Sequence, residues 1–203
     1  IHRYSPTFTL IHRYSPIFTD INLKYLHTCN IFPTFAPQLL YSIMKEMILS
    51  TRVTVCNEQE LDATQQALVA KAKAMTGQAY SPYSGFSVGA AALLEDGTVV
   101  AGSNQENAAY PSGLCAERVA LFAANANHPT LAVKALAIAC YTNGHFTKQA
   151  GTPCGACRQV MLETEHRFRQ PMQVILYGQE QCVIFDSAAD LLPLCFVAEN
   201  LER

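Results

Sequence analysis

The chain has 203 residues, half of them hydrophobic and 15% charged, which is enough apolar material for one domain with a sizeable core. A net charge of −2 argues against a broad basic surface, and so against nucleic acid as the partner. No apolar run approaches the roughly 20 residues that cross a bilayer, and no secretory signal is evident. We therefore expect a cytoplasmic protein with no membrane partner and a small-molecule substrate.

The first 46 residues differ in character from the rest of the chain. Four prolines interrupt any long helix there, and Asp20 is the only acidic residue before Glu46. We predict that residues 1–46 are an extension, disordered or non-native, and that residues 47–203 form a single domain. On this interpretation the native chain begins at Met44 or Met47.

The remaining chain predicts strands that alternate with helices. An amphipathic pattern predicts a helix over residues 58–76, and composition predicts a loop over residues 80–85. Apolar runs predict five strands, at residues 86–94, 98–102, 134–141, 173–177 and 182–185. Further helices are expected at residues 115–126, 154–167 and 187–192. This alternation implies a layered α/β fold around a central sheet.

Three cysteines stand at the predicted starts of two helices. Cys115 opens the first helix, and Cys154 and Cys157 open the second. Residues three positions apart share a helix face, so Cys154 and Cys157 can bind one ion together. The partial positive charge of a helix N-terminus favours the thiolate, which is the form that binds zinc. Three protein ligands leave the fourth tetrahedral position open, as is typical of catalytic zinc.

Two charged residues complete this cluster. Glu117, two residues beyond Cys115, need not bind the metal and can act as a general acid and base. Arg118 can offset part of the negative charge of three thiolates. A CxE motif followed by a CxxC motif matches the pattern described for zinc-dependent deaminases. The motifs therefore predict hydrolytic deamination, in which water attacks an amidine-like carbon and ammonia leaves.

The cysteines also allow other interpretations. A closed structural zinc site needs a fourth ligand, and no residue shows comparable spacing. A thioredoxin-like redox pair needs an early βαβ context, which is absent. A non-catalytic, zinc-stabilised binding module stays open, with Glu117 then serving only the helix dipole. Cys140, inside an apolar run, is expected to be a small buried hydrophobic residue.

The motifs resemble a known family. Residues 104–111 and 115–118, followed by residues 153–160, closely resemble the cytidine deaminases of pyrimidine salvage. The likeness covers roughly residues 58–200. It implies a three-layer α/β/α sandwich with a mixed five-stranded central sheet, one zinc ion per subunit and a homotetramer. It also implies hydrolysis of cytidine and 2′-deoxycytidine to uridine and 2′-deoxyuridine with release of ammonia.

The resemblance further implies which residues bind the nucleoside: Phe86, Asn104, Glu106, Tyr110, Ala116 and Phe196. Asn104 and Glu106 would bind the ribose hydroxyl, and polar side chains two residues apart in an extended segment do face the same side. Phe86 would lie against the pyrimidine ring. Tyr110 and Phe196 would reach the site of a neighbouring subunit. A blasticidin-type nucleoside deaminase is the related alternative, and Asn104 with Glu106 favours the ordinary nucleoside.

Overall fold

The computed structural model describes residues 46–201, so the predicted extension at residues 1–46 lies almost wholly outside the described part of the chain. The chain separates into a unit that ends at Ser50 and a second unit that starts at Thr51. Every helix and strand given below belongs to the second unit. Within the described residues, no helix has the length and apolar character needed to cross a membrane.

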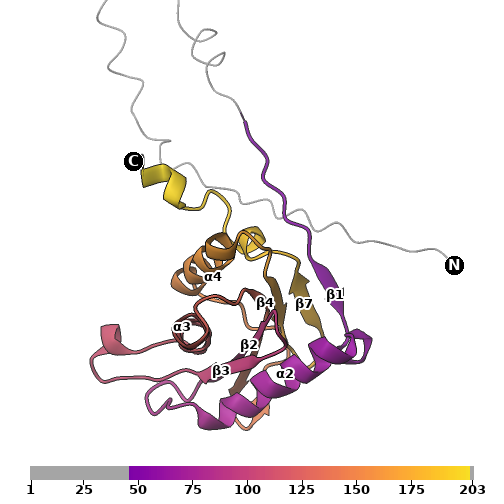
Figure 1. The fold of residues 1–203 in the computed structure, drawn as a ribbon. Helices are drawn as coiled ribbons and strands as arrows, with labels where there is room; N and C mark the ends of the chain where they lie inside the picture. Colours follow the sequence, from indigo (N-terminus) through magenta and orange to yellow (C-terminus); the bar gives the residue numbers. More distant parts are fainter. Residues whose placement is uncertain (1–45, 202–203) are drawn as a thin grey trace, which may run out of the picture. The chain divides into compact units, whose positions relative to one another are not determined.

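A seven-stranded sheet forms the middle of the second unit (Figure 1). Its strands are β1 (Thr54–Cys56), β2 (Ser87–Leu94), β3 (Val99–Ser103), β4 (Val133–Thr142), β5 (His145–Phe146), β6 (Gln173–Leu176) and β7 (Cys182–Phe185). Their order is β1-β7-β6-β4-β2-β3, and β5 pairs with β4. The sheet is mixed, as predicted, because β4 runs antiparallel to β2 and parallel to β6.

The prediction of five strands was wrong in number. The five predicted strands are all present, and β1 and β5 are additional. β1 has 3 residues and pairs with β7 at one edge of the sheet, whereas β5 has 2 residues and pairs with the end of β4. Segments this short cannot display the alternation of apolar and polar residues by which a strand is recognised in a sequence.

Helices cover both faces of the sheet, which confirms the three-layer α/β/α sandwich (Figure 1). α2 (Ala63–Met75) covers one face, and α3 (Ala116–Asn127) and α4 (Gly155–Phe168) lie together on the other. Successive side chains of a strand point to opposite faces. In β2, accordingly, Ala90 packs into the core beneath α3 and α4, and Ala91 packs into the core beneath α2.

The helix predicted over residues 58–76 is divided in two. A short 3-10 helix, Glu58–Glu60, comes first, and Asp62 then caps the start of α2. The Asp62 side chain accepts a hydrogen bond from the Gln65 amide, and the Gln65 side chain accepts one from the Asp62 amide. This reciprocal capping box begins a new helix, so α2 starts later than its apolar pattern indicates.

Two glycines allow the helices to approach the sheet closely. Gly89 in β2 faces α2, and Gly102 in β3 faces α3. A Cβ atom at Gly102 would lie 2.7 Å from the Ala120 nitrogen and 2.8 Å from Val119 Cγ1, well inside the contact distance of about 3.5–4.0 Å. The absence of a side chain at Gly102 thus lets α3, which Cys115 directly precedes, lie close to the sheet.

Candidate metal centre

The starts of α3 and α4 have no side-chain cap. Cys115 and Cys154 occupy the N-cap positions in extended conformation, and neither side chain accepts a hydrogen bond from its helix. Serine, threonine, aspartate and asparagine are preferred at this position, and losing such a cap costs about 1 kcal/mol. Both helix starts therefore lack the stabilisation of a side-chain cap, and neither sulfur atom is occupied by a capping hydrogen bond.

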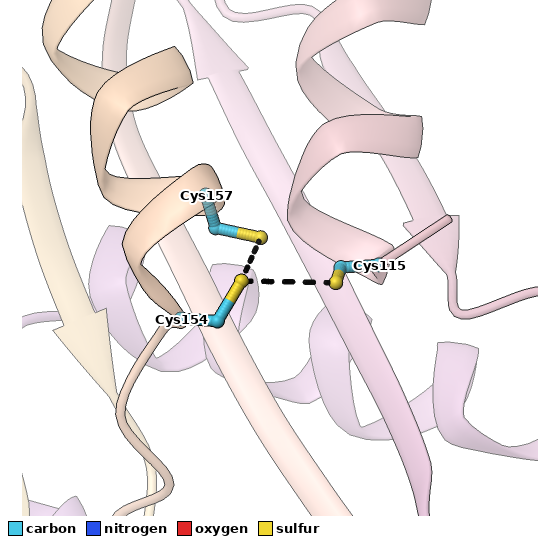
Figure 2. A group of neighbouring side chains, drawn as sticks. All are labelled: Cys115, Cys154 and Cys157. Atoms are coloured by element: carbon cyan, nitrogen blue, oxygen red, sulfur yellow. Dashed lines mark hydrogen bonds between the residues drawn. The ribbon is translucent and has the colours of Figure 1, made fainter. Parts of the chain in front are cut away.

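The three predicted ligands meet between these two helix starts (Figure 2). The Sγ atom of Cys154 lies 4.0 Å from that of Cys115 and 3.4 Å from that of Cys157, and all three sulfur atoms lie within 4.8 Å of one another. Tetrahedral zinc with Zn–S bonds of about 2.3 Å holds its sulfur ligands about 3.8 Å apart. The donor set and its spacing therefore fit a zinc ion.

The cluster supplies three ligands and leaves one side open. Across residues 46–201, no fourth cysteine, histidine or carboxylate joins the group. Cys157 is buried, Cys115 is half-buried and Cys154 is exposed, so the cluster lies at the edge of the core and not deep inside it. Such a geometry is that of a catalytic zinc site, because structural sites are closed by a fourth protein ligand.

The surroundings of the sulfur atoms favour a thiolate at Cys115. A hydrogen bond from the Cys157 thiol and the nearby Arg118 guanidinium lower the pKa of Cys115 to about 5. The Nη2 atom of Arg118 lies 3.5 Å from Cys115 Sγ. The pKa of Cys157 is raised by its hydrogen bond to Cys115 and by burial. Within this pair, the surroundings therefore favour the thiolate form at Cys115 more than at Cys157.

Glu117 is a buried acid in the first turn of α3, with only 5% of its surface exposed. Burial raises the pKa of its carboxyl group, and the negative charge of Cys115 raises it further. Hydrogen bonds from its own backbone amide and from the Cys157 thiol partly oppose this rise. A carboxyl group held in this way can take up and release a proton closer to neutral pH than an exposed glutamate.

A cavity of about 510 Å³ opens beside the cluster. It is lined by Tyr83, Ser84, Asn104, Gln105, Glu106, Asn107, Tyr110, Gly113, Leu114, Cys115 and Arg118. The lining thus joins one of the sulfur atoms to three residues that the resemblance assigned to the nucleoside: Asn104, Glu106 and Tyr110. The volume falls in the range of small-molecule sites, about 300–1,000 Å³.

The other predicted nucleoside-binding residues do not line this cavity. Ala116 is fully buried at the start of α3, and Phe86 is 38% exposed. Phe196 is 58% exposed, and its carbonyl oxygen accepts a hydrogen bond from Gln159. Tyr110, which does line the cavity, is 78% exposed and packs edge-on against Tyr83.

The loop before β2 also contributes to the site, which its sequence does not indicate. Composition predicted a loop there, but Tyr83 and Ser84 were not assigned to the site that they line. The loop reaches the cavity because Tyr80 forms a backbone bridge with Gln105, far away in sequence. No local pattern of residue types signals such a bridge.

The fold and the sulfur cluster define a zinc-binding α/β protein with a catalytic type of metal site. The family model of the cytidine and deoxycytidylate deaminase zinc-binding region matches residues 62–169. The chain is 42% identical over 136 residues to the cytidine deaminase of Sporosarcina psychrophila, which covers 67% of this chain and 93% of that protein. It is 45% identical over 128 residues to the cytidine deaminase of Mycobacterium tuberculosis strain H37Rv, which covers 62% and 84%.

A solved structure agrees with these sequence matches. The crystal structure of cytidine deaminase from Burkholderia pseudomallei superposes with a TM-score of 0.55 at 43% identity, over 64% of this chain and 97% of that one. The chain therefore belongs to the cytidine and deoxycytidylate deaminase family, as its motifs predicted, and zinc is its cofactor.

Proposed function

We propose that this protein deaminates cytidine and 2′-deoxycytidine hydrolytically, giving uridine or 2′-deoxyuridine and ammonia, and that it serves pyrimidine salvage. The observation that carries the proposal is the meeting of three sulfur atoms beside a cavity large enough for a nucleoside. Two relatives that match this chain over most of their own length are named cytidine deaminases. Their names support cytidine as the substrate.

Cys115, Cys154 and Cys157 hold one zinc ion per chain. When bound, zinc supplies a Lewis acid that makes water acidic enough to serve as a nucleophile near neutral pH. Two helix starts point at the sulfur atoms, and their dipoles stabilise the thiolates. Arg118 offsets part of the remaining negative charge, and its 3.5 Å contact with Cys115 Sγ supports this role.

Glu117 is the general acid and base. Its carboxylate accepts a proton from the attacking water and delivers it to the ring nitrogen beside C4 of the cytosine. The oxygen of the water forms a bond to C4, and Glu117 passes the second proton of the water to the amino group. The exocyclic C4–N bond then breaks, ammonia leaves, and the oxygen remains as the C4 carbonyl of the uracil ring. Burial raises the pKa of Glu117, which brings proton uptake and release toward the working pH.

Asn104 and Glu106 bind the ribose hydroxyl, Phe86 lies against the pyrimidine ring, and Ala116, at the start of α3, is part of the substrate site. Asn104 already donates to the Phe86 carbonyl oxygen at 2.9 Å and accepts from the Val88 amide at 2.7 Å. An amide side chain has two donor hydrogens and two acceptor positions. One donor and one acceptor of Asn104 therefore stay free for the nucleoside, on a side chain that the strand already orients.

The protein assembles as a homotetramer in which Tyr110 and Phe196 complete the site of a neighbouring subunit. Both residues are more than half exposed, and exposed aromatic residues are typical of a contact surface. Light scattering on the purified protein should give the mass of four chains. A fully active monomer would contradict this assembly.

Residues 47–203 form the deaminase domain, and residues 1–46 are an extension with no part in the reaction. The match to the family model begins at residue 62, which supports this division. A chain that begins at Met47 should keep the turnover of the full chain. The protein works in the cytoplasm, where three free thiols within 4.8 Å of one another stay reduced.

The test combines zinc content with cytidine turnover, followed by the fall in ultraviolet absorbance. The wild type should hold one zinc ion per chain and turn over both nucleosides. Glu117→Gln should retain zinc and lose turnover by about 10²–10⁴-fold, and Cys154→Ser should lose zinc as well. A zinc-loaded wild type that leaves both nucleosides unchanged would contradict the proposal, and turnover of blasticidin S alone would favour the related class.

A further inference from the structure

We infer that Ser84 is a positioning residue that orients Glu106 toward the ribose, an inference that rests on the function proposed above. The Ser84 hydroxyl donates to Glu106 Oε1 at 2.5 Å. The backbone amides of Tyr83 and Ser84 donate to Glu106 Oε2 at 2.9 and 3.3 Å. Two consecutive loop residues thus hold both oxygen atoms of one carboxylate in the wall of the cavity.

This arrangement limits how the substrate can meet Glu106. An ionised carboxylate offers about four acceptor positions, and the loop occupies three of them. Oε2 accepts two hydrogen bonds, and Oε1 accepts only the one from Ser84. The free position therefore lies on Oε1, and the Ser84 hydroxyl determines the direction from which a ribose hydroxyl can donate to it. The same hydrogen bond lowers the pKa of Glu106, which further favours the ionised form that accepts hydrogen bonds.

The hydroxyl of Ser84 is itself held in place. Its oxygen accepts a hydrogen bond from the Phe86 amide at 3.0 Å. A serine hydroxyl has one hydrogen and two acceptor positions, so the amide of Phe86 occupies an acceptor position and the hydrogen turns toward Glu106. Because the carboxylate that accepts this hydrogen bond is negatively charged, the hydrogen bond is stronger than one between neutral groups.

The base of the loop does not depend on this hydroxyl. The Tyr80 amide donates to the Asn104 carbonyl oxygen at 2.9 Å, and the Glu106 amide donates to the Tyr80 carbonyl oxygen at 2.8 Å. These backbone hydrogen bonds remain when the side chain of Ser84 is shortened. Ser84→Ala should therefore leave the loop attached and change chiefly the orientation of the carboxylate.

Steady-state kinetics of the zinc-loaded full chain test the inference, with cytidine and with 2′,3′-dideoxycytidine, which lacks the 2′- and 3′-hydroxyls of the ribose. Ser84→Ala should raise the KM for cytidine about fivefold and leave kcat within about twofold. The rise in KM is smaller than the loss of a buried hydrogen bond to a charged group would cause, because the loop is open to water. The KM for the dideoxynucleoside should change by less than about twofold. Ser84→Thr keeps the hydroxyl and should restore the KM for cytidine.

Ser81→Ala is the matched control, because Ser81 lies in the same loop and its hydroxyl pairs with Ser87 Oγ at 3.0 Å. It should keep the wild-type KM. In a Glu106→Gln background, Ser84→Ala should add little further loss. An equal rise in KM for both nucleosides, or kinetics of Ser84→Ala that match those of Ser81→Ala, would overturn the inference. A wild type that does not deaminate cytidine would refute the proposed function instead, so the two failures are distinct.

Discussion

Gly102 offers a test of whether the sheet positions the metal centre, because it lies where α3 comes closest to β3. We predict that Gly102→Ala weakens zinc binding although residue 102 lines neither the cavity nor the sulfur cluster. The added Cβ would lie 2.7 Å from the Ala120 nitrogen and 2.9 Å from Val119 Cβ. Both atoms are fixed to the helix backbone, so rotating a side chain cannot relieve the overlap.

The size of the effect follows from these distances. Restoring a contact of about 3.5 Å requires α3 to move away from the sheet by about 0.6–0.8 Å. Overpacking of this kind costs about 1–3 kcal/mol, and zinc–ligand distances tolerate only about 0.2 Å. Since Cys115 is joined directly to α3, part of the shift reaches its sulfur atom. We expect zinc affinity to fall by about tenfold or more, which is about 1.4 kcal/mol.

Gly89→Ala provides the control on the opposite face of the sheet. Its Cβ would overlap the Ala72 carbonyl oxygen and lie 2.8 Å from the Thr76 nitrogen, so it displaces α2, which carries no zinc ligand. Urea unfolding should show a loss of stability in both variants. A competition titration with a chelating dye should show weaker zinc binding only in Gly102→Ala. Wild-type zinc affinity in folded Gly102→Ala, or equal weakening in both variants, would refute the reasoning.

Three further changes test individual contacts. Arg118→Gln removes one of the groups that lower the pKa of Cys115, so zinc loss to a chelator should begin at higher pH than in the wild type; an unchanged pH profile would contradict this. Asp62→Ala removes the cap of α2 and should lower the free energy of unfolding by about 1 kcal/mol, seen as a lower urea midpoint with unchanged zinc content. The pKa of Glu106 is lowered by its hydrogen bonds to the loop, so their stabilising effect is present above the unfolded pKa of about 4.3 and is lost as pH falls through the folded pKa. The difference in urea midpoint between wild type and Ser84→Ala should therefore shrink as the pH falls through the folded pKa of Glu106. A difference that stays constant with pH would contradict this prediction.

Some parts of the fold could be predicted because their signals are local. The long apolar run of β4 and the amphipathic patterns of α3 and α4 each lie within one segment, and the structure places these elements within a few residues of the prediction. The start of α2 was misplaced because the cap at Asp62 interrupts an apolar pattern that begins earlier. β1 was missed because only its pairing with β7, more than a hundred residues away, makes it a strand.

The same distinction applies to the site. Cys154 and Cys157 lie on one helix, so their spacing alone predicted that they could share an ion. Cys115 joins them only through the packing of α3 beside α4. That Cys115 is the third ligand could be predicted because the CxE and CxxC motifs together match a known pattern. Ser84 meets Glu106 across 22 positions of sequence, through a loop with no periodicity, so no sequence pattern could assign it.

The uncapped starts of α3 and α4 limit how this enzyme can be made more heat-resistant. Replacing Cys115 or Cys154 with serine or aspartate would strengthen a helix end and destroy the metal centre, so these two positions must be left untouched in any engineering effort. The far end of α4 is open to change, because Arg169 there adopts a left-handed conformation with φ 52° that glycine or asparagine tolerates better. Substitutions that raise heat resistance should therefore be placed at the C-terminal ends of the helices, away from the N-terminal ends that carry the cysteines.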